Sequence, residues 1–243
     1  MQSDHIPFNI DNSVERINEI LAATAASFTD SDSIPARDQL SFINGYYINC
    51  CAIFVDIRKS SQLIDIHKNR VLAKIYRAYI SEMSAVINGN VDCAEVNIVG
   101  DCVWGVFNTP DKPTLQNVFV TAAKMASMIR ILNYKLKKNN LTEIKVGIGV
   151  SWGRALMVKA GYKGSGINDV VWMGNVVNEA SKLASYGNRE SYDKEMMVSS
   201  DFQNNLKDEE KKLLTFNSIR NCYHGVVWSS YLTDWYDKNC PPI

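Results

Sequence analysis

The sequence lacks several features that define common functional classes. Its 26 Lys and Arg residues are balanced by 26 Asp and Glu residues, so no net charge attracts duplex DNA or an anionic membrane. No apolar run approaches the length of a membrane-spanning helix. The opening residues lack the charged and apolar regions of a secretion signal, which predicts a cytoplasmic protein. We therefore expect neither nucleic acid nor a membrane as a main partner.

Metal-binding patterns built from cysteine and histidine are also missing. The chain has only three histidines, and no two of them form an HxxxH pair. No CxxC spacing occurs among its six cysteines, which are Cys50, Cys51, Cys93, Cys102, Cys222 and Cys240. We expect small core residues in a reducing compartment rather than a zinc site or a disulfide framework.

The length and composition are ordinary for a folded protein with a sizeable core: 243 residues, of which 46% are apolar and 21% charged. Residues 1–45 read as an N-terminal extension, and residues 46–243 as the main domain. The extension is predicted to hold a helix from Asn12 to about Phe28, with an apolar face that includes Val14, Ile17 and Leu21. We expect this face to pack against the main domain or a partner subunit.

The stretch Ala94–Phe107 carries the strongest chemical signal. It reads as two apolar strands joined at Gly100-Asp101, where Gly100 supplies the positive φ that a two-residue turn needs. Asp56 ends an earlier apolar run. Each residue alone is typical of an ordinary turn aspartate. If the two strands are neighbours, however, the carboxylates converge and form a Mg²⁺ site.

The remaining patterns predict an α+β fold. We expect a buried strand over 46–57, a helix over 66–87, a hairpin over 93–107, a helix over 114–139 and a strand over 144–150. This order is the ferredoxin-like βαββαβ arrangement, in which the first and third strands are adjacent. A C-terminal αβ elaboration follows: a turn and returning strand over 151–158, a strand over 169–172, a helix over 174–186, and a hairpin pairing 214–220 with 226–232.

Four motifs in this order resemble the catalytic domain of class III nucleotidyl cyclases. They are Phe54-Val55-Asp56-Ile57, Val99-Gly100-Asp101, the glycine-containing segment 147–153, and the segment 174–182 that contains Asn178 and Lys182. The resemblance covers about residues 46–232.

The resemblance implies roles for individual residues. Asp56 and Asp101 would bind two divalent ions, Mg²⁺ or Mn²⁺, with the Ile57 carbonyl as a further ligand. Asn178 would orient the ribose, and Lys182 would stand where the family usually has an arginine that steadies the transferring phosphate. Base recognition would fall to Asn97 and Val171. Arg220 or His224 would supply a late contact to the triphosphate.

Two departures from the family pattern point to an unusual base. Asn97 with Val171 matches neither the adenine-reading nor the guanine-reading pair, and Lys182 lacks the planar fork of arginine. A degenerate, inactive domain is one explanation. The retained Asp56, Asp101 and Asn178 favour another, a resemblance to the pyrimidine cyclases of the Pycsar antiphage systems. That resemblance predicts cyclic CMP or cyclic UMP as product, and we favour CTP narrowly as substrate.

The expected assembly is a homodimer with its active sites at the interface, because both halves of the family's site occur in this one sequence. The product would act on a separate effector that senses cyclic nucleotides. The alternatives are a purine cyclase with an atypical base pocket and a nucleotide-binding module without turnover. An RNA-binding ferredoxin-like domain is disfavoured, because the chain lacks an aromatic strand pattern and a basic face.

Overall fold

The structure is a computed structural model that describes residues 5–243, apart from the side chain of Ile64. Its contacts group the chain into two compact units, one of residues up to 49 with 154–175 and one of residues 50–153 with 176–243. The N-terminal extension predicted over residues 1–45 falls within the first unit. Segment 154–175, which sequence analysis assigned to the main domain, falls in that unit too.

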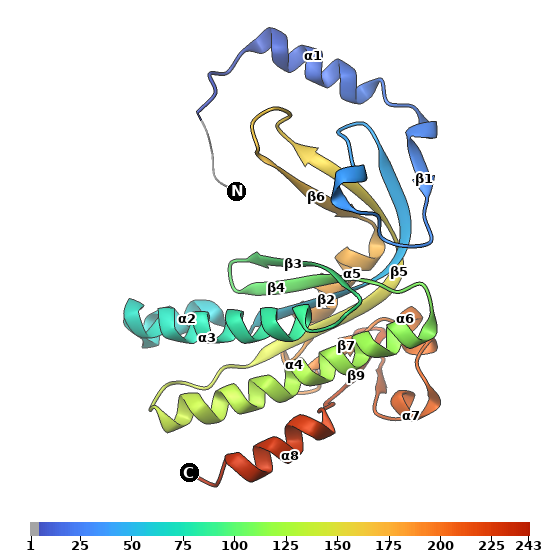
Figure 1. Cartoon of the computed structure of the whole chain (residues 1–243). Helices are drawn as coiled ribbons and strands as arrows, with labels where there is room; N and C mark the ends of the chain where they lie inside the picture. The colour runs from blue at the N-terminus through green and yellow to red at the C-terminus, as the bar shows by residue number, and fades with distance from the viewer. Residues whose placement is uncertain (1–4) are drawn as a thin grey trace. The chain divides into compact units, whose positions relative to one another are not determined.

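The second unit contains the predicted βαββαβ core. In chain order its elements are β2 (Gly45–Ile57, from Cys50 on), α2 (Ser60–Ile66), α3 (Asn69–Asn88), β3 (Cys93–Val99), β4 (Cys102–Asn108), α4 (Lys112–Lys138), β5 (Val146–Gly161, up to Gly153), α5 (Asn175–Tyr186, from Val176 on), β7 (Met196–Val198), α6 (Ser200–Asn204), α7 (Asp208–Lys211), β8 (Thr215–Asn217), β9 (Cys222–Gly225) and α8 (Ser230–Asn239) (Figure 1). The sheet order is β3-β4-β2-β5-β7-β9-β8. The first and third strands of the core, β2 and β4, are antiparallel neighbours as predicted. The helix expected over 66–87 is confirmed as α3, and a further short helix that was not predicted, α2, precedes it.

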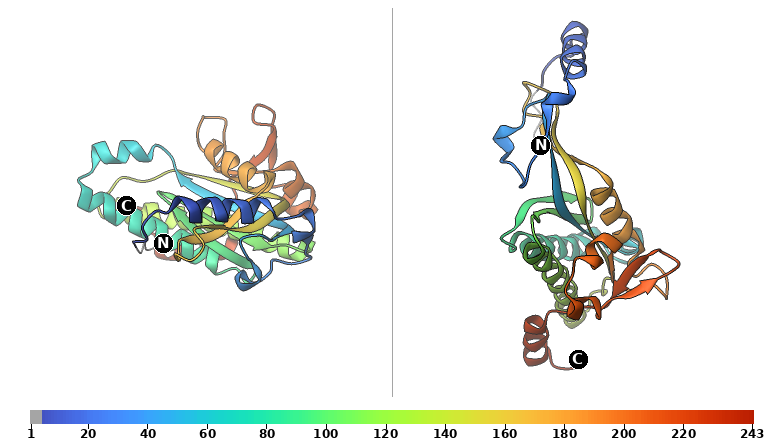
Figure 2. Two further views of the ribbon diagram at one scale, coloured as in Figure 1. Left: turned by 90° about the horizontal axis from the view of Figure 1, so that it is seen from above. Right: turned by 90° about the vertical axis from the view of Figure 1, so that its right-hand side faces the viewer.

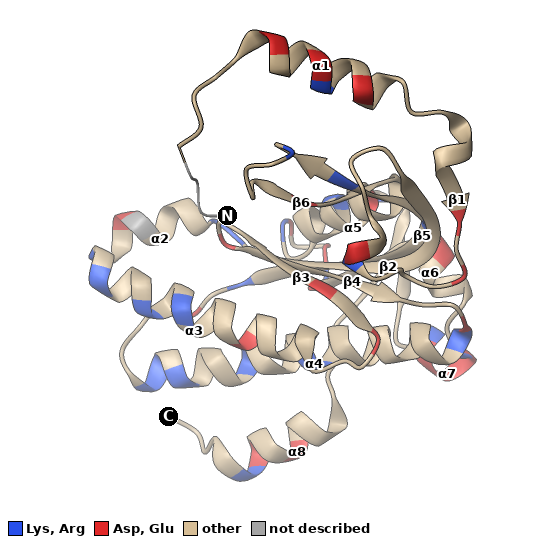
Figure 3. Cartoon of the chain, turned by 45° about the horizontal axis from the view of Figure 1, so that its top comes forward, with Lys and Arg blue, Asp and Glu red and all other residues tan. Residues whose placement is uncertain are grey.

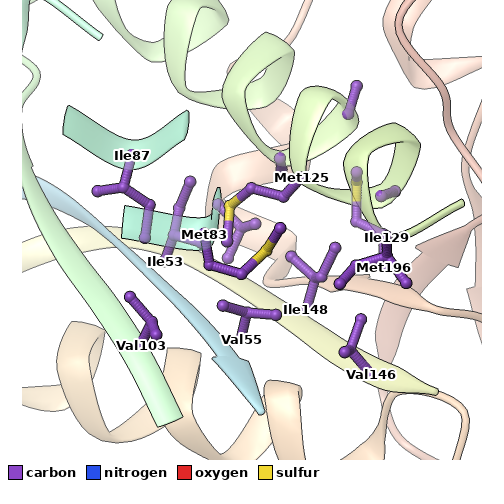
Figure 4. Close-up of a cluster of buried hydrophobic side chains, with 14 of the residues drawn as sticks. Ile53, Val55, Met83, Ile87, Val103, Met125, Ile129, Val146, Ile148 and Met196 are labelled. Carbon is purple, nitrogen blue, oxygen red and sulfur yellow. The ribbon is translucent and has the colours of Figure 1, made fainter. Parts of the chain in front are cut away.

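The core lies between the sheet and helices α3 and α4. Strand alternation turns Ile53 and Val55 of β2, with Ile148 of β5, toward Met83 of α3 and Met125 of α4 (Figure 4). All five side chains are fully buried. The alternate residues of β5 face the other side of the sheet, where α5 lies (Figure 2). The sheet is therefore covered on both faces, which explains the nearly continuous apolar run in β2.

The first unit is built around two strand pairings and a helix. It holds α1 (Ile10–Leu21), the 3₁₀ turns η1 (Ala25–Ser27) and η2 (Arg37–Gln39), β1 (Phe28–Asp30), the start of β2, the end of β5 and β6 (Asn168–Met173). Strand β6 pairs antiparallel with β5, and β1 pairs parallel with β2. The prediction of a helix from Asn12 to Phe28 is wrong at both ends. Asn9 caps α1 by accepting from the Asn12 backbone N–H, and the helix stops at Leu21.

The apolar face predicted on α1 is exposed. No residue of α1 is buried, and Val14, Ile17 and Leu21 are 47%, 53% and 77% exposed.

Two other predicted elements differ in the structure. The turn expected at 151–153 is absent, and β5 runs unbroken from Val146 to Gly161. Glycines in this strand accommodate a closely packed helix rather than a turn. The final hairpin pairs 215–217 with 222–224, so its second strand lies before the predicted 226–232. Residues 230–239 form helix α8 instead of a strand.

Three further features of residues 5–243 concern membrane-spanning helices, the cysteines and the basic residues. Helices there are all too short or too polar to cross a membrane. Cys50, Cys51, Cys222 and Cys240 are buried free thiols, and no disulfide occurs in residues 5–243. Basic residues occur along α3 and in the last turn of α4 (Figure 3).

Candidate active site

The β3–β4 hairpin holds Asp101 at its tip. Val99 pairs with Cys102, which leaves Gly100 and Asp101 as the two turn residues. Gly100 has φ +63°, while a Cβ atom at this position would meet nothing within 4 Å. Backbone conformation, rather than space, therefore explains the glycine.

The pairing of β2 with β4 brings the two predicted metal ligands together. Val55 is opposite Val103, so Asp56 and Asp101 follow at the same edge of the sheet. The two carboxyl groups lie close enough for each to affect the ionisation of the other. Burial and the charge of Asp101 raise the pKa of Asp56, against the opposing charge of Arg58. Two carboxylates this close favour a shared proton or a shared cation.

The carboxyl pair fits a divalent ion. Asp101 Oδ2 is buried without a hydrogen-bond partner among the described residues. In residues 5–243, no cluster of three or more His, Cys, Asp or Glu side chains is arranged to hold a metal. A site with two carboxylates suits Mg²⁺, which keeps several waters and takes further oxygens from substrate phosphates. Ile57, whose carbonyl is the predicted extra ligand, is the last residue of β2.

The cysteine next to this pair is held in its thiol form. Burial first, and then the charges of Asp56 and Asp101, raise the pKa of Cys102 to about 12.

Arg58 is a residue that sequence reasoning did not single out. Its Nη2 donates to Asp56 Oδ2 at 2.6 Å, and its Nη1 donates to the Ser185 carbonyl at 2.8 Å. The side chain is only 14% exposed. Arg58 therefore neutralises part of the carboxyl pair and also reaches α5. Its position two residues after Asp56 was the only signal in the sequence.

Helix α5 carries Asn178 and Lys182 on its exposed face. Val176, Ala180, Leu183 and Ala184 form the buried face. Lys182 Nζ lies 6.0 Å from the ring centre of Tyr186. Because Asn178 and Lys182 are one helical turn apart, their side chains project together. Their exposure leaves both side chains accessible to a partner molecule.

The predicted base-reading residues have different surroundings. Asn97 on β3 donates from Nδ2 to Glu95 Oε1 at 2.8 Å, which leaves its Oδ1 as an oriented acceptor. Glu95 is only 7% exposed and was missed by sequence analysis. The alternation of β3, which puts residues 95 and 97 on one face, was the signal that could have found it. Val171 lies on β6 in the first unit and is 41% exposed.

Arg220, the predicted triphosphate contact, is engaged in a buried ion pair. It donates through Nε and Nη2 to the two oxygens of Asp193, at 3.2 and 2.8 Å. Its guanidinium also stacks over Tyr186 at 4.4 Å. Burial opposes ionisation of Asp193, but the bonds from Arg220 bring its pKa below the ordinary value. His224, the other candidate, lies within 3.2 Å of Asn217 Nδ2.

The profile of the adenylate and guanylate cyclase catalytic domain matches residues 44–220. The chain therefore belongs to the class III nucleotide cyclases, as its motifs suggested. It is 40% identical to a uridylate cyclase of Gulbenkiania mobilis, over 98% of this chain and all of that protein. A uridylate cyclase of Treponema porcinum is 36% identical, over 85% of this chain and 73% of that protein. The adenylyl cyclase CyaB from P. aeruginosa has the same fold, with a TM-score of 0.60 and 20% identity over 71% of this chain and 85% of that one.

Proposed function

We propose that this protein is a pyrimidine nucleotide cyclase that converts UTP to 3′,5′-cyclic UMP and pyrophosphate. The observation that carries the proposal is the half-buried Asp56–Asp101 pair, in a chain whose relatives named above are both called uridylate cyclases. These names do not support the sequence-based preference for CTP, so UTP replaces it as the proposed substrate.

The reaction is the attack of the ribose 3′-hydroxyl on the α-phosphorus, with pyrophosphate as leaving group. Asp56 and Asp101 would hold the divalent ions, Mg²⁺ or Mn²⁺ and two per site, that acidify the hydroxyl and neutralise the phosphates. Asn178 would orient the ribose. Lys182 would stabilise the charge that grows on the α-phosphoryl oxygens, a contribution worth on the order of 3 kcal/mol. Positioning and charge stabilisation are the main demands of phosphoryl transfer.

Base recognition in this proposal centres on Asn97. With one Nδ2 hydrogen held by Glu95, Asn97 presents its Oδ1 and a second N–H. Oδ1 suits the N3–H of uracil, and the free N–H suits its adjacent carbonyl. The same pair also suits the cytosine edge, so the choice of UTP depends on the relatives. Val171 would supply an apolar wall without a hydrogen bond for a purine edge.

The direct test is nucleotide profiling. Purified full-length chain is incubated with ATP, GTP, CTP or UTP and with Mn²⁺ or Mg²⁺, and the products are separated by chromatography. We expect cyclic UMP to dominate and Asp101→Asn to abolish it. Dominant cyclic CMP would restore the CTP prediction, and dominant cyclic AMP or GMP would remove the pyrimidine proposal. Nucleotide binding without pyrophosphate release would indicate a non-catalytic module.

The proposal includes a homodimer in which each active site takes Asp56, Asp101 and Asn97 from one chain and Asn178 and Lys182 from the other. Mixed dimers of an Asp101→Ala chain with a Lys182→Ala chain test this sharing. One of their two sites keeps every side chain intact, so the isolated mixed dimer should have about half the wild-type activity, while each variant alone stays inactive. Two-step affinity purification of differently tagged chains isolates the mixed dimers.

The biological role follows from the resemblance to antiphage pyrimidine cyclases. Cyclic UMP would serve as a second messenger for a separate effector. Cells that express the chain should accumulate cyclic UMP after phage infection, and Asp101→Asn cells should not.

A further inference from the structure

Arg58 connects the metal-binding end of β2 to helix α5 of the same chain. Its guanidinium donates to Asp56 Oδ2 at 2.6 Å, to the Asp56 carbonyl at 3.3 Å and to the Ser185 carbonyl at 2.8 Å. Its backbone N–H donates to the Lys145 carbonyl on the approach to β5, at 2.7 Å. The residue is thus fixed by main chain and side chain at once.

The contact with Ser185 lies at the end of α5 where a cation is favourable. The last carbonyls of a helix have no partner within the helix and carry partial negative charge. Arginine can satisfy such a carbonyl and a carboxylate together, because its donors form a rigid planar fork. A lysine at this position offers a single charged centre and cannot span both groups with the same geometry.

Packing fixes the inner face of α5 along its length, and Arg58 adds a hydrogen bond at its C-terminal end. A Cβ at Gly149 would come within 2.1 Å of the Ala180 carbonyl, so the helix backbone rests directly on β5. Lys182 and Asn178 are on the opposite, exposed face. The orientation of that face depends on how the C-terminal end of α5 is held. Arg220 stacks on Tyr186 at this end, and Arg58 is the charged side chain that joins it, through the Ser185 carbonyl, to Asp56.

We infer that Arg58 is a positioning residue that acts on both active sites of the dimer. Through Asp56 it acts on the site of its own chain, and through Ser185 it aligns Asn178 and Lys182 for the site of the partner chain. The inference rests on the proposed function, because it needs sites shared between two chains. It adds a physical link between the two sites that runs through one side chain.

The mixed dimers described above separate the two actions. In the one intact site of the mixed dimer, the Asp101→Ala chain contributes only its α5. The Lys182→Ala chain contributes only its carboxylates. When Arg58→Gln is added to the Asp101→Ala chain, we expect kcat to fall about tenfold with an unchanged half-saturating Mn²⁺ concentration. When it is added to the Lys182→Ala chain, we expect Mn²⁺ to bind severalfold more tightly, because a competing cation is removed.

Two measurements distinguish these effects of Arg58→Gln from a loss of structure. Thermal unfolding of each mixed dimer checks the fold, and Mn²⁺ binding is followed without turnover through the paramagnetic resonance signal of the free ion. Arg58→Lys on the Asp101→Ala chain keeps the charge and should still lower kcat, because the fork is lost.

The outcomes distinguish this inference from the function on which it rests. An unchanged kcat for Arg58→Gln on the Asp101→Ala chain, with complementation intact, would overturn the link through α5. An absence of activity in the parent mixed dimer would overturn the shared site itself, and the link with it.

Discussion

At the scale of single residues, Glu195 is an acid whose burial raises its pKa to about 7. It lines a cavity of about 720 Å³ together with Arg130 and Trp228. A carboxyl with a raised pKa in the folded state contributes stability at low pH, and that contribution is lost as the pH rises through about 7.

We therefore predict that Glu195→Gln stabilises the protein increasingly as the pH rises. The gain in the free energy of unfolding should grow by about 2 kcal/mol between about pH 5 and about pH 8. Urea unfolding of wild type and variant across this range measures it. A gain that is equal at both ends of the range, or a loss at the alkaline end, would contradict a raised pKa.

The convergence of the two aspartates was predictable because it depends only on the pairing of neighbouring strands. Asp56 and Asp101 were found from their places at strand ends, and the structure brings their carboxyls together. Glu95 and Arg58 escaped notice because a charged residue near a turn or on a strand is usually solvated. Only the folded environment shows that Glu95 orients Asn97 and that Arg58 joins Asp56 to Ser185.

At the scale of elements, glycines of β5 let the backbone of α5 lie directly on the strand. We predict that Gly149→Ala prevents α5 from seating, because its Cβ would lie 2.2 Å from the Ala184 backbone nitrogen. The expected result is a loss of more than about 3 kcal/mol of stability, and of cyclase activity with it. Gly153→Ala is the matched control, since its Cβ would meet Val176 at an ordinary 3.7 Å. Equal stability of the two variants would refute the packing argument.

The ion pair between Arg220 and Asp193 joins the loop before β7 to the β8–β9 hairpin. We predict that Arg220→Met destabilises the protein by about 3 to 5 kcal/mol, because it leaves the fully buried Asp193 carboxylate without its counter-ion. Chemical denaturation measures this, with the exposed Arg189→Met as control. If stability stays unchanged while KM for UTP rises, Arg220 contacts the triphosphate as the family resemblance suggested.

Element order was predictable from periodicity, whereas several boundaries were not. The run of β2 and the Gly100 turn are local signals, and both were confirmed. The turn predicted at the start of 151–158 was wrong, because its Gly153 lies inside the continuous strand β5. Gly147 and Gly149 were correctly placed in a strand, but the α5 backbone that requires them lies far along the sequence. The C-terminal helix α8 was missed because its short amphipathic pattern follows a strand-like run.

At the scale of the whole molecule, the proposed site needs two chains. We predict that specific activity falls on dilution, and that below the dimer dissociation constant a tenfold dilution lowers it about tenfold. Steady-state rates over a dilution series, beside sedimentation velocity at the same concentrations, measure this. Constant specific activity in a solution of monomers would contradict the shared site. A single sequence supplies both halves of the site but contains no direct signal of their association.

The thiol of Cys102 has a consequence for chemical probing. Alkylating reagents attack the thiolate, and a pKa of about 12 leaves very little thiolate near neutral pH. Iodoacetamide should therefore modify Cys102 only as often as the hairpin tip opens, and faster in Asp101→Asn, where one of the charges that suppress ionisation is gone. The rate at which Cys102 is labelled, followed by mass spectrometry, then reports how often the β3–β4 hairpin tip opens.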